Sequence, residues 1–166
     1  MEFRFDKNSI ELQGVSYKNI PNMPIESACM FSNTGMDRLI CMGGRDINFK
    51  YLKDVLELDM EEWKPLPSLS VARWGAGSCY LNKTLIVGGG GISYGGPLKS
   101  IEMLPMEASD NAPEWEMSTS TLPYGVSGHT IVPFNNKLML IGGWAVGSGV
   151  TNRVWEGTLN KSNKVS

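Results

Sequence analysis

The sequence offers few residues that could carry out catalysis. It contains a single histidine, His129, so a metal site built from several histidines is excluded. A Gly-x-Ser-x-Gly sequence, which would place a serine nucleophile on a sharp turn, is absent, and His129 has no convincing serine or cysteine partner. We therefore expect His129 to be a structural residue and the chain not to be an enzyme.

Two glycine-rich stretches resemble phosphate-binding loops but lack the residues that such loops need. The run Gly88–Gly91 has no Gly-Lys-Ser/Thr ending and no helix is expected after it, and Gly147–Gly149 is followed by Asn152 where a dinucleotide-binding loop has its third glycine. The acidic residues of the middle region lack the spacing of a calcium loop, so we expect no cofactor, no metal and a solvated rim. These residues are Asp46, Asp54, Asp59, Glu61 and Glu62.

The composition is that of one globular domain. The 166 residues are 42% hydrophobic and 19% charged, with a formal net charge of −2. No basic stripe is present, so nucleic acid is not the expected partner. Apolar runs are far shorter than a membrane span, and charged residues near the start argue against a signal peptide. The expected location is therefore cytoplasmic, with no membrane attachment.

The three cysteines, Cys29, Cys41 and Cys79, indicate a reducing compartment. Their odd number and the lack of a Cys-x-x-Cys spacing favour core thiols. The alternative is a disulfide between Cys29 and Cys41, which would face each other across a hairpin. Two Asn-x-Ser/Thr sequons, at Asn82 and Asn160, would matter only in a secreted protein.

A threefold internal repeat provides the elements that would position any site. An apolar run ends on a glycine pair at Gly43-Gly44, Gly88-Gly89 and Gly142-Gly143, so the step is 45 residues (88 − 43) and then 54 (142 − 88). A short apolar stretch and a polar turn precede each run. The pattern predicts repeated units of short antiparallel strands. The third strand of each unit is expected around Val55, Ile101 and Val154.

A tryptophan closes the first two units, at Trp63 and Trp115, and a Leu-Pro pair follows each, at Leu66-Pro67 and Leu122-Pro123. With these features the chain resembles the kelch-repeat family, whose period is about 50 residues. The resemblance implies an all-β fold of four-stranded antiparallel propeller blades, in which the tryptophan fills the wedge between blades. The tyrosine that many kelch repeats carry before the tryptophan is missing here.

The resemblance covers nearly the whole chain, as a single kelch-repeat domain of residues 1–166. We expect a partial blade at 1–24, blades at about 28–63, 75–115 and 129–159, and a polar tail at 160–166. In the partial blade, Phe3–Asp6 matches a third strand, residues 7–14 form an irregular insert, and Tyr17 stands where Trp63 stands.

Three blades and a partial one do not close a ring, because propellers use about four to eight blades. Either the chain is a fragment of a longer propeller, or two copies form a homodimer that completes a ring of about six blades. The sequence favours the first alternative.

Loops after each glycine pair and before each first strand should gather at one end of the blades. They carry aromatic and arginine residues, which are typical interface anchors. Arg45 and Arg73 have no clear partner in sequence and are expected to be exposed and to bind, whereas Trp74 and Trp144 either bind or plug gaps between blades. The predicted binding residues are Arg45, Asp46, Arg73, Trp74, Tyr94, Tyr124 and Trp144.

The resemblance to kelch proteins implies a non-catalytic module that binds a protein partner through these loops, often one related to the cytoskeleton or to ubiquitin ligases. One alternative is a secreted carbohydrate-binding propeller, in which tryptophan and tyrosine stack on sugars. The other is a metal-dependent kelch-like enzyme, for which the sequence lacks a cluster of ligands.

Overall fold

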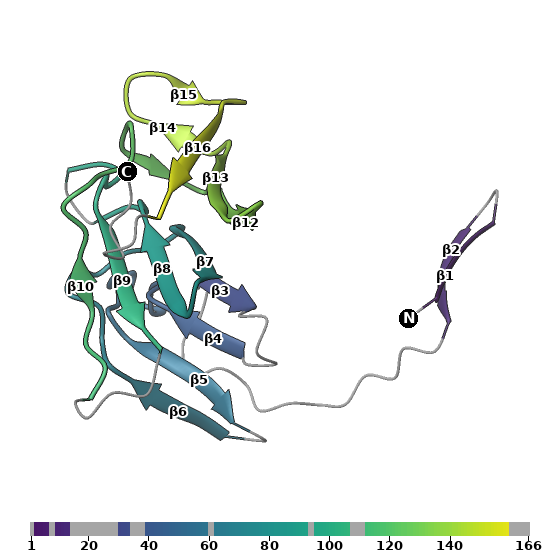
Figure 1. Cartoon of the computed structure of the whole chain (residues 1–166), viewed down its shortest axis with the longest axis horizontal. Coiled ribbons are helices and arrows are strands. Elements are labelled where there is room, and N and C mark those ends of the chain that lie inside the picture. Colours follow the sequence, from purple (N-terminus) through teal and green to yellow (C-terminus); the bar gives the residue numbers. More distant parts are fainter. Residues whose placement is uncertain are drawn as a thin grey trace.

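The computed structural model of the chain describes residues 2–6, 9–13, 30–33, 39–59, 62–92, 95–106 and 112–159, with only the backbone described up to residue 33. These residues form strands and loops and contain no helix (Figure 1). All strand pairs of the named sheets are antiparallel. The expected all-β fold class is confirmed.

Two sheets are four-stranded blades whose strands follow one another in chain order. Blade 1 consists of β3 (Met30–Asn33), β4 (Leu39–Met42), β5 (Val55–Asp59) and β6 (Glu62–Leu66). Blade 2 consists of β7 (Gly77–Leu81), β8 (Thr84–Gly88), β9 (Ile101–Pro105) and β10 (Glu116–Met117).

Blade 3 has three strands among the described residues, and two smaller sheets accompany the blades. Blade 3 consists of β12 (Thr130–Phe134), β13 (Lys137–Ile141) and β16 (Val154–Thr158). A small sheet joins β11 (Val126–Ser127), β14 (Trp144–Ala145) and β15 (Gly149–Val150). The N-terminal hairpin pairs β1 (Glu2–Asp6) with β2 (Ser9–Gln13).

The three blades are stacked one on the next, from the blue blade 1 to the green and yellow blade 3 (Figure 1). Their first strands β3, β7 and β12 are neighbours in space. Leu85 and Val87 of β8 belong to a buried cluster shared with blade 1, whereas Ile86 belongs to a second cluster shared with blade 3. Because blade 2 is packed on both faces, all five residues of β8 are buried.

Trp115, just before β10, fills the wedge between blades 1 and 2. It packs against the buried cluster between these blades together with Leu66 and Met106. Its Nε1–H donates a hydrogen bond of 2.7 Å to the carbonyl oxygen of Pro67, in the linker after blade 1. The tryptophan thus ties the outer edge of blade 2 to the linker, as the resemblance to kelch repeats implies.

In blade 2, the glycine pair that is structurally equivalent to Gly43-Gly44 and Gly142-Gly143 is Gly89-Gly90. Gly43, Gly89 and Gly142 have φ of 62°, 67° and 65°, in the left-handed region. Each N–H donates to the residue that precedes the third strand, at 2.8 Å for Gly43, 3.1 Å for Gly89 and 3.0 Å for Gly142. Gly88 is instead the last residue of β8, opposite Gly77. The pair Gly88-Gly89 expected from sequence is therefore wrong by one residue.

The linkers between blades also differ in register from the expectation. Leu69 N–H donates to the carbonyl of Lys53, and Leu122 N–H donates to that of Lys99, both at 2.9 Å. Both leucines are buried, so Leu122 is the structural equivalent of Leu69 and not of Leu66. The two Leu-Pro pairs therefore occupy different positions in their linkers.

The N-terminal hairpin has the register of a third and a fourth strand. Asp6 lies opposite Ser9, as Asp59 lies opposite Glu62 in the hairpin of β5 and β6. The expectation of an irregular insert at 7–14 is therefore wrong for β2. The register places Ile10 at the position of Trp63, and Tyr17 lies outside the described residues.

The described blades form an open stack, so the ring is incomplete. Blade 2 uses one of its faces to pack against blade 3. The equivalent face of blade 3 is not covered by another described blade, and Val154 and Ile141 are exposed on it. The pairing of two copies into a closed ring stays a prediction, which the mass of the purified chain in solution would test.

The described cysteines are core residues. Cys41 lies buried on β4, and Cys79 lies buried on β7. Burial raises the pKa of the Cys79 thiol to about 12, so the thiol stays protonated at neutral pH. Cys29 lies outside the described residues.

Candidate functional site

Two kinds of segment gather at one end of the stack, which we call the loop end. They are the loops after the glycine pairs and the linkers that join one blade to the next. They are hydrogen-bonded to each other across blades. Gly44 N–H donates to the carbonyl of Arg73 in the next linker, and Gly90 N–H donates to that of Val126, both at 2.8 Å. The loops are therefore fixed by backbone bonds, which makes the loop end a rigid platform.

The loop of blade 1 displays apolar side chains on a tight turn. The Asp46 Oδ1 atom accepts from the backbone N–H groups of Asn48 and Lys50, both at 2.9 Å. Phe49, whose φ is 62°, is 67% exposed, and Ile47 is 68% exposed. Asp46 thus shapes the loop through its carboxylate, an arrangement typical of aspartate in turns.

Trp74 lies between the loops of blades 1 and 2. Its backbone exchanges hydrogen bonds of 3.2 and 2.8 Å with Gly91, whose lack of a side chain leaves room for the indole. The indole stacks on Tyr51, with ring centroids 6.2 Å apart and planes 10° apart. The Arg45 guanidinium carbon lies 5.7 Å from the Trp74 ring and 4.8 Å from the Phe49 ring. Trp74 therefore bridges two blades and helps to hold Arg45 beside Phe49.

Arg73 is not a surface residue. Its side chain is fully buried, and its Nη2 atom lies 2.7 Å from the Glu102 Oε1 atom. Nη1 donates to the carbonyl oxygens of Gly89 and Ser100 at 2.8 and 3.2 Å. The expectation that Arg73 is exposed and without a partner is wrong, because Glu102 on β9 reaches it from 29 residues further along the chain.

The remaining predicted residues lie near blade 3. Trp144 on β14 is 49% exposed, and Val146 in the turn after β14 and Val150 on β15 are also exposed. Tyr124 is half-buried against the cluster between blades 2 and 3, with its ring edge-to-face on Trp155 at 6.0 Å. Tyr94 lies outside the described residues. The structure thus brings Arg45, Asp46 and Trp74 together and leaves Tyr124 and Trp144 at another blade.

The predicted list omits the most exposed apolar residues of the loop end. Ile47 and Phe49 are displayed on the turn of blade 1, and Val150 is 87% exposed on β15 of the small sheet. One signal was available in the sequence, since Ile47 and Phe49 flank an asparagine directly after the turn-forming Asp46. Such a stretch favours a turn, and apolar residues on a turn have no core to enter.

His129 is a core residue at the junction of blades 2 and 3. It is 5% exposed, and a Cβ atom on Gly77 would lie 2.7 Å from its Nε2 atom. Burial lowers the pKa of His129 to about 4. The imidazole is therefore neutral and enclosed, which agrees with the structural role expected for it.

The buried neutral His129 predicts a pH dependence of stability. Between pH 6.5 and 4 the unfolded chain takes up a proton at His129 that the folded chain excludes. The free energy of unfolding should therefore fall as the pH falls through this range, by up to about 3 kcal/mol, and this contribution is absent above pH 6.5. Urea unfolding at several pH values, compared with His129→Gln, measures it. An equal slope in both proteins would contradict the assignment to His129.

The described residues contain no cluster of the usual metal ligands. Among them, no three His, Cys, Asp or Glu side chains lie close enough together to share a metal ion. No helix in the described part of the chain is long and apolar enough to cross a membrane.

No family model matches the chain. The chain is 31% identical to Adagio protein 3 of Arabidopsis thaliana and 27% identical to Adagio-like protein 3 of Oryza sativa subsp. japonica, each over 132 residues, which are 75% of this chain and 21% of those proteins. It is 31% identical over 117 residues to Kelch-like protein 25 of Homo sapiens, which covers 68% of this chain and 20% of that protein. The chain thus spans about a fifth of the length of these relatives.

A solved structure, titled Structure of YjhT, has a similar fold. The TM-score is 0.69 at 22% sequence identity, and the match covers 84% of this chain and 44% of that chain. At this identity the likeness concerns the fold alone. The repeated blades with their glycine pairs and wedge tryptophan, taken with these relatives, show that the chain belongs to the kelch-repeat family and that its described residues form blades of a partial β-propeller.

Proposed function

We propose that the chain is a non-catalytic module that binds a protein partner through the loop end, with Phe49 as the central anchor. One observation carries this proposal: Phe49 is exposed and yet held in place by the Asp46 turn and the Arg45 guanidinium. A side chain that is already ordered loses little conformational entropy on binding. Aromatic and arginine residues are also enriched among interface hot spots.

The contacts of Trp74 favour a protein partner over a sugar. A sugar stacks on an open aromatic face, but the Trp74 ring already stacks on Tyr51 and lies against Gly91. Phe49 and Ile47 instead offer apolar area of the kind that a protein pocket receives. The cytoplasmic location and a partner related to the cytoskeleton or to ubiquitin ligases stay predictions.

The chain offers a matched control for Phe49. Phe134 is 62% exposed and precedes the turn between β12 and β13, at the opposite end of the blades. A photoreactive phenylalanine analogue at position 49 is expected to form a covalent adduct with one partner in cells, whereas the same analogue at position 134 is not. Mass spectrometry of the adduct identifies the partner.

The affinity for this partner then tests the anchor. Phe49→Ala is expected to weaken binding at least tenfold, because about 1.5–3 kcal/mol is lost when a buried aromatic side chain is removed. Phe134→Ala is expected to change the affinity less than twofold. Equal adducts from both positions, or unchanged affinity of Phe49→Ala with an unchanged unfolding midpoint, would disprove the proposal.

A further inference from the structure

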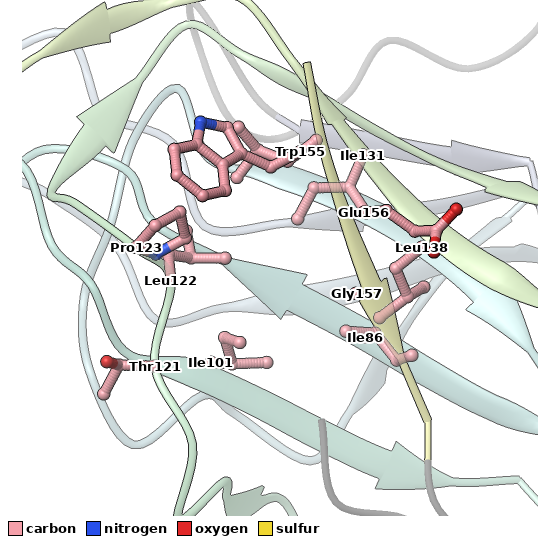
Figure 2. A pocket seen from close by; sticks show the side chains of 11 residues that line it. Ile86, Ile101, Thr121, Leu122, Pro123, Ile131, Leu138, Trp155, Glu156 and Gly157 are labelled. Atoms are coloured by element: carbon pink, nitrogen blue, oxygen red, sulfur yellow. The ribbon is translucent and has the colours of Figure 1, made fainter. Parts of the chain in front are cut away.

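A cavity of about 180 Å³ lies between blades 2 and 3, away from the loop residues around Phe49. Figure 2 shows Ile86 and Ile101 of blade 2 on one side of it and Trp155 of blade 3 on another. The rest of the wall is mostly aliphatic and includes Leu122, Pro123, Ile131, Leu138 and Leu140. An apolar cavity of about 150 Å³ is large enough to bind benzene, so this one accommodates an aromatic ring.

The protein itself fills the equivalent space between blades 1 and 2. Five residues of the cavity wall have equivalents there, by the strand register and the hydrogen bonds of the linkers. For Ile86, Ile101, Leu122, Leu138 and Leu140 the equivalents are, in order, Ile40, Val55, Leu69, Leu85 and Val87. These equivalents form a buried cluster with Leu104 of β9, against which Trp115 packs. The two junctions share these positions, so the cavity arises from residues that differ.

A glycine on β16 is one such difference. Leu85 lies opposite Leu104 on β9, and in the same register Leu138 lies opposite Gly157 on β16. The side chain of Leu104 is fully buried in the cluster between blades 1 and 2. Gly157 has no side chain to fill the equivalent volume, and it lines the cavity. The described strands of blade 3 therefore leave space between the blades that the strands of blade 2 fill.

Trp155 is the second difference, and it gives the cavity an aromatic wall. It takes the place of Glu102, because Glu102 pairs with Val87 as Trp155 pairs with Leu140. The ring of Tyr124 lies edge-to-face on that of Trp155, with centroids 6.0 Å apart, and this contact helps to fix the indole. A planar aromatic molecule in the cavity gains the same kind of contact with Trp155. An aromatic ligand is therefore favoured over an aliphatic one.

The charges around the cavity favour a neutral ligand. Glu156 also borders the cavity, but its carboxylate lies 2.6 Å from the Nζ atom of Lys137. Apart from Glu156, Thr121 and Gly157, the lining residues are apolar. An ionic ligand would lose its hydration in such surroundings without gaining a partner of opposite charge.

We propose that the cavity is a binding site for a small, neutral, planar aromatic molecule of about the size of indole. The molecule lies between blades 2 and 3, against the ring of Trp155 and in the space beside Gly157. Thr121 and Pro123 are exposed residues of the lining, so we expect the ligand to enter past them. The site is separate from the loop end and does not need a protein partner there.

The probe is 5-fluoroindole, whose fluorine NMR signal reports binding to the whole chain. We expect saturable binding with a Kd below about 1 mM, because a preformed apolar pocket of matching size needs little reorganisation. Among the ¹⁵N-labelled tryptophans, the indole N–H signal of Trp155 should shift, and that of Trp74 at the loop end should not. The unfolding midpoint should rise with the ligand concentration, because the ligand binds the folded chain.

Variants of β16 and of Trp155 test the two features of the cavity. Gly157→Leu should fill it with the side chain that blade 2 has at Leu104, and should weaken binding at least tenfold because no room for the ring remains. Gly157→Ala adds only a methyl group and should weaken binding by a smaller factor. Val154→Leu enlarges an exposed side chain on the opposite face of β16 and should leave the affinity unchanged. Trp155→Leu should weaken binding about threefold, because the aromatic contact is lost.

Three outcomes would overturn the proposal. The first is the absence of saturable binding at millimolar 5-fluoroindole. The second is an unchanged affinity of Gly157→Leu or, if that variant does not fold, of Gly157→Ala. The third is a shift of the Trp74 signal in place of the Trp155 signal, which would mean that the ligand binds at the loop end. An unchanged affinity of Trp155→Leu would overturn the preference for an aromatic ligand.

Discussion

The Glu102→Leu variant is expected to lose about 3–5 kcal/mol of the free energy of unfolding, because it leaves a buried charge without its partner. Both side chains of the Arg73–Glu102 ion pair are fully buried. Burial lowers the pKa of Arg73, and Glu102 acts against this shift. Glu102 also accepts from the backbone N–H groups of Ser70 and Val71, at 2.6 and 3.2 Å. Urea unfolding followed by tryptophan fluorescence measures the loss.

The double variant Arg73→Val/Glu102→Leu tests the cause of this loss. Val126 occupies the position equivalent to Arg73 at the next junction and is fully buried there. Removing both charges should recover at least about 2 kcal/mol relative to Glu102→Leu, because no unpaired charge remains.

An exposed ion pair serves as the comparison for Arg73–Glu102. Lys137 and Glu156 lie 2.6 Å apart, with side chains 42% and 51% exposed. Glu156→Ala should cost less than about 1 kcal/mol. A loss in Glu102→Leu as small as this would show that the Arg73–Glu102 pair is reached by water.

Gly89→Ala is expected to destabilise the chain by about 4 kcal/mol, from the left-handed backbone and from steric strain together. The φ of Gly89 is 67°. A Cβ atom there would lie 2.5 Å from the carbonyl oxygen of Val126 and 2.7 Å from Cε1 of His129. The first contact is with the backbone of the next linker, which cannot move away without breaking the hydrogen bond from Gly90. Thermal and urea unfolding measure the loss.

Two neighbouring glycines separate the causes. At Gly88, a Cβ atom would lie 3.2 Å from Cδ1 of Ile131, the end of a flexible side chain, so Gly88→Ala should cost less than about 1 kcal/mol. Gly128 has a φ of 64° and no atom within 4 Å of an added Cβ. Gly128→Ala should therefore cost about 1–2 kcal/mol, from the backbone alone. A greater loss of the free energy of unfolding in Gly88→Ala than in Gly89→Ala would favour Gly88-Gly89, the pair expected from the sequence, over Gly89-Gly90.

The threefold repeat made the blades predictable from the sequence. The position of the glycine pair in blade 2 was not predictable, because four glycines follow one another there. Apolar runs such as Leu85–Val87 are buried on both faces of a blade, so their composition is constrained at every position. The run Gly88–Gly91 contains three overlapping glycine pairs. The hydrogen bonds from Gly89 N–H to the carbonyl of Ser100 and from Gly90 N–H to that of Val126 select the pair Gly89-Gly90.

The candidate site was predictable in part. Arg45 and Asp46 follow a glycine pair and Trp74 precedes a first strand, and these positions predicted that the three residues lie at one end of the blades. They did not distinguish Arg73, the residue next to Trp74, which points into the protein. The partner of Arg73 is Glu102 on β9, 29 residues further along the chain, so no local pattern in the sequence indicates this pair.

The sequence by itself determined the main strands of the three blades, the blade repeat and the scarcity of catalytic groups, because each depends on residue types at short spacing. The tertiary structure decided which loop residues are exposed, as for Phe49, and which are buried, as for Arg73. It also decided that Trp115 has a seat between blades whose counterpart beside Trp155 is a cavity. Burial and cavities arise where two blades meet, and the residues that form such a junction lie tens of positions apart in the chain.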